Sequence, residues 1–173
     1  MCGMKIIHKD QRVGIFIDIQ NLYHSAKNIH HARVNYKELI KALIASRQLI
    51  RAIGYVVKSE QSAISGEASF FEALGKSGIE LRIKDLQIFA GGMKKADWDV
   101  GMAVDAIRTA NSLDTVILVT GDGDFIPLVE YLKWGLGKEV EVAAFGRSAS
   151  AKLKEVADYF IDLDRTPRVI LKK

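Results

Sequence analysis

Four aspartates carry the clearest chemical signal in the sequence. Asp18 interrupts the apolar run IFIDI, where a carboxylate costs free energy unless something pairs with it. Asp122 and Asp124 directly follow the apolar run TVILVT, and Asp99 stands where helical periodicity begins. If these carboxylates converge, they repel one another and raise each other's pKa values, so a divalent cation is the simplest compensation. Oxygen ligands of this kind suit Mg²⁺ or Mn²⁺.

Such a cation site points to chemistry on phosphate esters. In phosphodiester hydrolysis, a bound divalent cation lowers the pKa of the attacking water and stabilises charge on the leaving oxygen. We therefore predict that Asp18, Asp99, Asp122 and Asp124 serve as both metal ligands and catalytic residues. Each also has an ordinary structural explanation, because Asp suits helix N-termini, N-caps and turns. Asp18 fits that explanation least, since it stands within a strand pattern.

Further polar residues near these positions are weaker candidates for the same site. Asn21 can bind a phosphate oxygen or a metal-bound water, or it can cap the following helix. Thr120 stands just before the acidic turn and can orient a ligand. Asp97 accompanies Asp99 where the helix begins, and Asp105 lies about a third of a turn off the face of Asp99.

Three basic residues are candidates for contacts with a nucleic-acid backbone. Lys94 and Lys95 belong to a glycine-containing loop, and Arg147 precedes Ser148 at a strand-to-helix junction. Such side chains, with the free backbone N–H groups of a helix start, can hold phosphate. Alternatively, they are solvated surface charges. The formal net charge of +4 is compatible with an anionic partner but adds little by itself.

Strands and helices alternate along the chain. Apolar runs rich in β-branched residues predict strands, and 3.6-residue periodicity between them predicts helices. We expect strands at 13–19, 50–57, 79–86, 115–120 and 139–145, with a short sixth at 159–163. We expect helices from 21, over 35–44, 65–76 and 97–110, after 124 as far as 135–137, and over 148–157. In the helix of 97–110, Val100, Val104 and Ile107 form an apolar stripe.

This alternation predicts the α/β class, with a mainly parallel five- to six-stranded sheet and helices on both faces. Ligands of such sheets bind at the carboxyl ends of the strands, where the strand order reverses. If the first and fourth strands are neighbours there, Asp18 faces Asp122 and Asp124 across a crevice. The principal acids all fall at this edge of the predicted sheet.

The composition is that of a single globular domain. The chain has 173 residues, 49% hydrophobic and 27% charged, with two prolines and no repetitive segment. We assign residues 1–12 to an N-terminal extension, 13–164 to the domain and 165–173 to a C-terminal tail. The lone Cys2 cannot form an internal disulfide, and no apolar run suits a membrane span or signal peptide. We expect a cytoplasmic protein without a membrane partner, and the sequence leaves homo-oligomer formation open.

Three segments stand out as motifs: FIDIQN at 16–21, KKADWDVGMAVD at 94–105 and VTGDGDFIPLVEYL at 119–132. Together and in this order they resemble the NYN domain, in particular its LabA-like bacterial and archaeal branch, whose members are PIN-like. The resemblance runs from about Val13 to Asp164. It implies a Rossmann-like three-layer (PIN-like) fold and Mg²⁺- or Mn²⁺-dependent (endo)ribonuclease activity, with RNA favoured over DNA. The matching motif positions are Asp18, Asn21, Asp99, Asp122 and Asp124, with Asp105 at a further acidic position.

Other enzyme classes fit less well. A haloacid-dehalogenase-like phosphatase needs a second acid two residues after its nucleophile, and Gln20 stands there after Asp18. A receiver domain would carry its phosphoacceptor after the third strand, where this chain has a glycine- and lysine-bearing loop. The four histidines lack a Cys/His ligand set, which argues against zinc, and no P-loop motif is present. The remaining alternative is a non-catalytic module that uses the same fold to bind nucleic acid or a protein partner.

Overall fold

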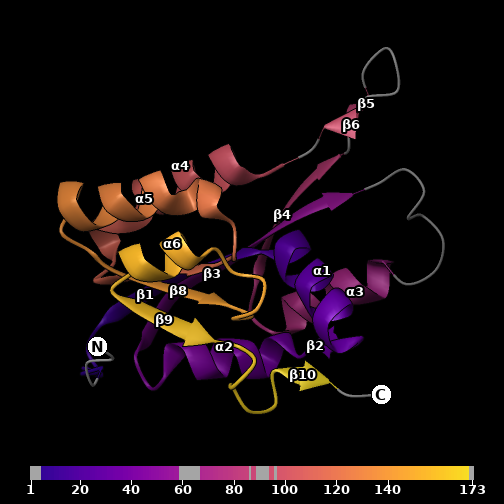
Figure 1. Ribbon diagram of the computed structural model, residues 1–173, viewed down its shortest axis with the longest axis horizontal. Coiled ribbons are helices and arrows are strands. Elements are labelled where there is room, and N and C mark those ends of the chain that lie inside the picture. The colour runs from indigo at the N-terminus through magenta and orange to yellow at the C-terminus, as the bar shows by residue number, and fades with distance from the viewer. Residues whose placement is uncertain (1–4, 59–66, 86, 89–93, 96, 172–173) are drawn as a thin grey trace.

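A six-stranded sheet forms the centre of the computed structural model, which describes residues 5–58, 67–85, 87–88, 94–95 and 97–171 (Figure 1). All neighbouring strands run parallel, in the order β4-β3-β1-β7-β8-β9. The predicted α/β class with a mainly parallel sheet is therefore confirmed. The strands are β1 (Arg12–Asp18), β3 (Gln48–Lys58), β4 (Glu80–Asp85), β7 (Thr115–Val119), β8 (Glu139–Ala144) and β9 (Tyr159–Asp162).

Helices cover both faces of the sheet and give a three-layer arrangement (Figure 1). The helices of one layer are α1 (Ile19–His30), α2 (Tyr36–Ile44) and α3 (Glu67–Lys76), and those of the other are α4 (Asp99–Thr109), α5 (Ile126–Glu130) and α6 (Ala151–Val156). Alternation along β1 serves both cores, because Ile15 and Ile17 pack with the first layer and Phe16 with the second. Within the described part of the chain, no helix combines the length and apolarity needed to span a membrane.

The remaining helices and strands of the described chain are short. The 3₁₀ turns η2 (Ala110–Ser112) and η3 (Gly123–Phe125) flank β7, and a π-helical segment, η4 (Tyr131–Gly135), follows α5. The strand β10 (Ile170–Leu171) pairs antiparallel with β2 (Arg33–Val34), and Val169 beside it is fully buried. The strand β5 (Gln87–Ile88) pairs antiparallel with β6 (Lys94–Lys95), so the loop predicted around the two lysines includes a strand pair.

The apolar stripe predicted on α4 does not face the core. Val100 and Val104 are 74% and 52% exposed, and Ile107 is 39% exposed. Instead Met102 and Ala106 pack on the sheet, and the small alanine lets the helix approach it closely. Sequence periodicity selected the two valines and the isoleucine instead of Met102 and Ala106, and the prediction was wrong for that reason.

Candidate active site

The strand order places the two predicted acidic segments side by side. β1 and β7 are neighbours in the sheet, with Ile17 in register with Val119. Along the chain, β1 leads by way of α1 and α2 to β3 on its other side, so the strand order reverses between β1 and β7. Asp18 at the end of β1 therefore lies next to the turn that follows β7. This is the switch point at which ligands of parallel sheets bind.

Asp18 joins the end of β1 to the start of α1. Its Oδ1 accepts a hydrogen bond from the backbone N–H of Asn21 at 3.0 Å, which makes it the N-cap of α1. The hydroxyl of Thr120 donates to its Oδ2 at 3.4 Å. Burial raises the pKa of Asp18, and the negative charge of Asp122 acts in the same direction. A carboxylate with one hydrogen bond on each oxygen keeps lone pairs free for a further ligand.

Asn21 and Thr120 hold the acidic turn in place. The side-chain Oδ1 of Asn21 accepts a hydrogen bond from the backbone N–H of Gly121 at 3.0 Å. The hydroxyl of Thr120 accepts one from the N–H of Asp122 at 3.2 Å. Gly121 is needed at this point, because a Cβ there would lie 3.0 Å from the Cα of Ala149. The turn is thereby fixed to β1, α1 and the segment before α6.

Three carboxylates converge at this turn. Asp99 at the start of α4, Asp122 and Asp124 each place an oxygen so that all three atoms lie within 4.8 Å of one another. Asp122 also caps η3, since its Oδ1 accepts from the N–H of Asp124 at 3.0 Å. Burial, and then the charge of Asp97 and of the other acids, raises the pKa of Asp99 to about 6. The negative charges therefore interact strongly at this position.

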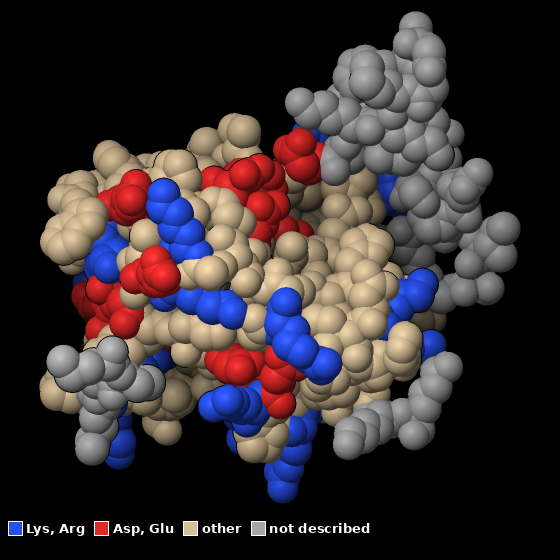
Figure 2. All heavy atoms as spheres, in the orientation of Figure 1, with Lys and Arg blue, Asp and Glu red and all other residues tan. Residues whose placement is uncertain are grey.

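A cleft of about 220 Å³ opens over these acids. The residues that line it are Asp18, Gln20, Asn21, Tyr55, Asp97, Trp98, Asp99 and Asp122. Figure 2 shows acidic side chains gathered in this region, above α1 and beside the ends of α4 and α5. Within the described residues, no lysine, arginine or histidine forms an ion pair with any acid of the cleft or with Asp124. A hard divalent cation with oxygen ligands fits this donor set.

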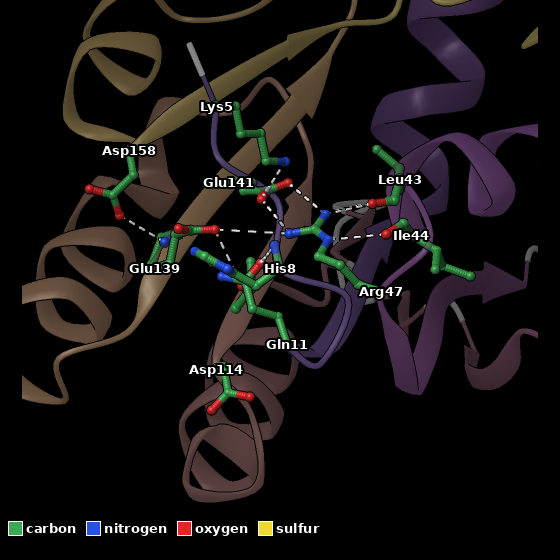
Figure 3. Close-up of polar contacts among 12 residues, drawn as sticks. Lys5, His8, Gln11, Leu43, Ile44, Arg47, Asp114, Glu139, Glu141 and Asp158 are labelled. Carbon is green, nitrogen blue, oxygen red and sulfur yellow. Dashed lines mark hydrogen bonds and ion pairs between the residues drawn. The ribbon is translucent and has the colours of Figure 1, made fainter. Parts of the chain in front are cut away.

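The acids near the opposite ends of the strands are arranged differently (Figure 3). Glu141 in β8 is fully buried, and Arg47 binds it through Nη1 at 2.6 Å, while Nζ of Lys5 lies 2.5 Å from the same carboxylate. Nη1 of Arg47 also lies 3.9 Å from Glu139. Here two cations balance two acids within the protein. The acidic cleft has no such partners among the described residues, so its negative charge is not balanced in the same way.

Asp105 is separated from the converging carboxylates. It is 8% exposed, its Oδ2 accepts the Tyr55 hydroxyl at 2.9 Å, and its Oδ1 lies 2.5 Å from Arg108. Arg82 lies 3.5 Å away on the other oxygen. Two arginines balance the charge of Asp105. Its link to the cleft is the hydrogen bond from Tyr55, whose side chain lines the cleft. From the sequence, we predicted only that Asp105 lies about a third of a turn off the helix face that carries Asp99.

The three basic residues proposed from the sequence are not among the described residues that line the cleft. Arg147 is exposed, and its Nη2 lies 3.7 Å from Asp164 rather than near the cleft. The side chains of Lys94 and Lys95 lie outside the described residues, although the backbone of β6 comes shortly before α4. Any contact of these three residues with phosphate stays a prediction.

Neither Tyr55 nor Trp98 was named as a site residue from the sequence, and both line the cleft. Tyr55 lies in the buried part of β3 and is in register with Asp18, so its place in the second predicted strand could have marked it. Trp98 lies against it, with ring centroids 5.5 Å apart, and donates from Nε1 to the Val56 carbonyl at 2.8 Å. The two rings therefore form an aromatic wall beside the carboxylates.

The raised pKa of Asp99 predicts how the stability of the metal-free protein depends on pH. The folded state holds this proton more tightly than the unfolded state, so stability is lost as pH rises from about 4 to about 6. In urea unfolding with EDTA, we expect Asp99→Asn to match the wild type near pH 4 and to exceed it above pH 6. A difference between the two proteins that is the same at all pH values would contradict this.

The three-layer fold with its mainly parallel sheet is that of a PIN-like domain, and comparison with known families agrees. The NYN domain family model matches residues 12–164, so the chain belongs to the NYN domain family, a PIN-like nuclease family. It is LabA-like: it is 26% identical over 171 residues to the low amplitude and bright protein LabA of Synechococcus elongatus, covering 90% of this chain and 86% of that protein.

Two further relatives extend the comparison. An uncharacterized protein of Methanocaldococcus jannaschii is 37% identical over 79 residues, which cover 44% of this chain and 32% of that protein. The crystal structure of a protein of unknown function from Vibrio parahaemolyticus superimposes with a TM-score of 0.86 at 29% identity, covering 96% of this chain and all of that one. The fold of the chain is therefore shared over nearly its whole length.

Proposed function

We propose that this protein is a metal-dependent nuclease that hydrolyses phosphodiester bonds, with RNA as the favoured substrate. The observation that carries the proposal is the convergence of Asp99, Asp122 and Asp124 within 4.8 Å. These acids have no cationic partner among the described residues, and they lie at the switch point of a parallel sheet. Membership of a nuclease family agrees with it.

The residues of the cleft divide the work between holding a cation and fixing the geometry. Asp99, Asp122 and Asp124 would hold Mg²⁺ or Mn²⁺, with Asp18 binding at the same cleft directly or through water. The bound cation would supply a lowered pKa for the attacking water and stabilisation of the leaving oxygen. Asn21 and Thr120 keep the acidic turn in register with β1, so the carboxylates are positioned before substrate arrives. Asp97 adds negative charge beside Asp99.

Basic residues outside the cleft would bind the backbone of the substrate. Lys94 and Lys95 lie on β6, shortly before Asp99 begins α4. Among the described residues, the ion pair of Arg147 is a long contact of 3.7 Å with Asp164, and the exposed guanidinium can exchange it for a phosphate group at small cost. Such contacts release counterions, so we expect substrate binding to weaken as salt concentration rises.

The proposal is tested by cleavage of labelled single-stranded RNA and DNA. Purified protein is incubated with Mn²⁺, Mg²⁺ or EDTA, with the double variant Asp18→Asn/Asp122→Asn alongside. We expect cleavage of RNA that needs a divalent cation and is lost in the double variant. Cleavage that persists in EDTA, or in the double variant, would refute the assignment of the site. Thermal unfolding with and without Mn²⁺ gives an independent readout, since a ligand of the folded state raises the melting temperature.

A further inference from the structure

A second, larger cavity adjoins the acidic cleft. This groove, of about 780 Å³, lies on the face of the sheet covered by α1, α2 and α3 (Figure 1). Gln20, in the first turn of α1, lines both the cleft and the groove. The two cavities therefore both border Gln20 at the start of α1.

Aromatic side chains are prominent in the lining of this groove. Tyr23 is 44% exposed, and Tyr36 and Phe70 pack edge to face beside it with ring centroids 5.9 Å apart. The described residues that line the groove include no Asp or Glu, whereas they include Arg33. Nζ of Lys27 lies 5.8 Å from the centroid of the Tyr23 ring. The groove thus combines one exposed ring, that of Tyr23, with positive charge, next to a cleft that is strongly acidic.

Tyr36 contributes a polar group to the groove. It is 8% exposed and lines the groove, where its hydroxyl can bond to a ligand or to solvent. Burial raises the pKa of this hydroxyl, which keeps it protonated and able to donate.

We propose that this groove binds an unpaired nucleotide of a single-stranded nucleic acid whose backbone continues past Gln20 into the acidic cleft. This inference rests on the proposed nuclease function. Base stacking on an exposed ring such as Tyr23 tolerates any base, because every base has a π face. The Tyr36 hydroxyl would bind a polar edge of the base, and Lys27 and Arg33 would bind its phosphates. A base inside a duplex is stacked on its neighbours and paired, so it offers neither a free face nor its Watson–Crick edge to the groove.

The groove should allow this surface to distinguish single-stranded from double-stranded nucleic acid. Only a strand with free bases fills both cavities at once, so a flexible single strand or loop is the form that this arrangement selects. A duplex would contact the basic residues alone. The aromatic residues should therefore matter for single strands and hardly at all for duplexes.

The test measures binding of a fluorescein-labelled ten-nucleotide oligouridine, and of an RNA duplex of equal length, by fluorescence anisotropy in EDTA. We expect Tyr23→Ala to weaken binding of the single strand about tenfold, and Tyr36→Phe to weaken it about threefold. Neither change should alter duplex binding by more than about twofold. Tyr131→Ala is the matched control, because Tyr131 is 48% exposed on η4, in the other helical layer, and lies outside both cavities.

Equal single-strand affinities for Tyr23→Ala and Tyr131→Ala would overturn the proposal, as would an absence of binding by the wild type. Equal losses for single strand and duplex would also overturn it, because they would indicate a general effect on charge or folding. The same oligonucleotide is then incubated with Mn²⁺. Cleavage without any dependence of affinity on Tyr23 would leave the nuclease intact and refute the groove. Tyr23-dependent binding without cleavage would support the groove and refute the nuclease.

Discussion

Replacing Asp99 with asparagine is expected to lower metal-dependent cleavage about a hundredfold or more, and at the same time to stabilise the metal-free protein. The loss follows because a catalytic cation contributes several kcal/mol to the transition state, and each 1.4 kcal/mol or so corresponds to tenfold in rate. The gain follows because burial, and then the negative charges of the neighbouring acids, raise the pKa of Asp99 to about 6, so its ionised form is disfavoured at neutral pH. An amide of the same shape removes that repulsion.

The expected gain in stability is modest because Asp99 is only partly buried. Solvent screening limits it to about 1 kcal/mol, or about 2–4 °C in melting temperature for a chain of this size. The measurements are initial rates on single-stranded RNA in Mn²⁺ and thermal unfolding in EDTA. Asp10→Asn is the control, since Asp10 is exposed in the turn before β1, away from the cleft. An Asp99→Asn protein that is both fully active and no more stable than the wild type would show that Asp99 is an ordinary surface acid.

Opposite effects on activity and stability separate a ligand-binding cluster from a structural one. If the acids served only as helix caps, removing a charge would either cost stability or change nothing. A functional cluster instead stores repulsion that a ligand relieves. Mn²⁺ should therefore raise the melting temperature of the wild type by more than that of Asp99→Asn.

The sequence was sufficient to place the acids at one edge of the sheet. Asp18 and the pair Asp122/Asp124 each follow a strongly apolar strand pattern, and parallel strands end at the same edge. The sequence did not show that β1 and β7 are neighbours, because this depends on the order of the strands in the sheet. Right-handed crossovers restrict that order but do not determine it. The register between Ile17 and Val119 resolves it.

Side-chain contacts between elements could not be predicted in the same way. Asp105 and Tyr55 are 50 residues apart, and their hydrogen bond depends on how α4 crosses β3. The phase of α4 was itself predicted wrongly, because the helix packs through the small residue Ala106 and leaves Val100 exposed. Periodicity ranks residues by hydrophobicity, whereas close packing also depends on size and on the space between layers.

The buried pair of Arg47 and Glu141 provides the second large expected effect, on stability. Arg47→Met should lower the free energy of unfolding by about 3–5 kcal/mol, because it leaves the carboxylate of Glu141 buried without its main partner. The guanidinium also donates to the carbonyls of Leu43 at 2.7 Å and Ile44 at 3.0 Å, at the C-terminal end of α2 (Figure 3). These carbonyls would lose a partner as well.

The control for charge and size is Arg51→Met. Nε of Arg51 lies 3.0 Å from Glu80, but both side chains are 40% or more exposed. Exposed pairs of this kind contribute little, so we expect a change of no more than about 1 kcal/mol. Urea unfolding at pH 7 compares the two variants. Similar losses for Arg47→Met and Arg51→Met would refute the idea that burial makes the Arg47 pair different.

A double variant separates the two sources of this loss. In Arg47→Met/Glu141→Leu, no arginine–glutamate charge remains buried, so the protein should regain at least half of the stability lost in Arg47→Met alone. Lys5 then loses its partner, but it is partly exposed and can turn to solvent. Cleavage should be unchanged in the double variant, because this network lies near the amino ends of the strands, opposite the acidic cleft. Failure to recover would instead attribute the loss to the hydrogen bonds that Arg47 donates to the end of α2.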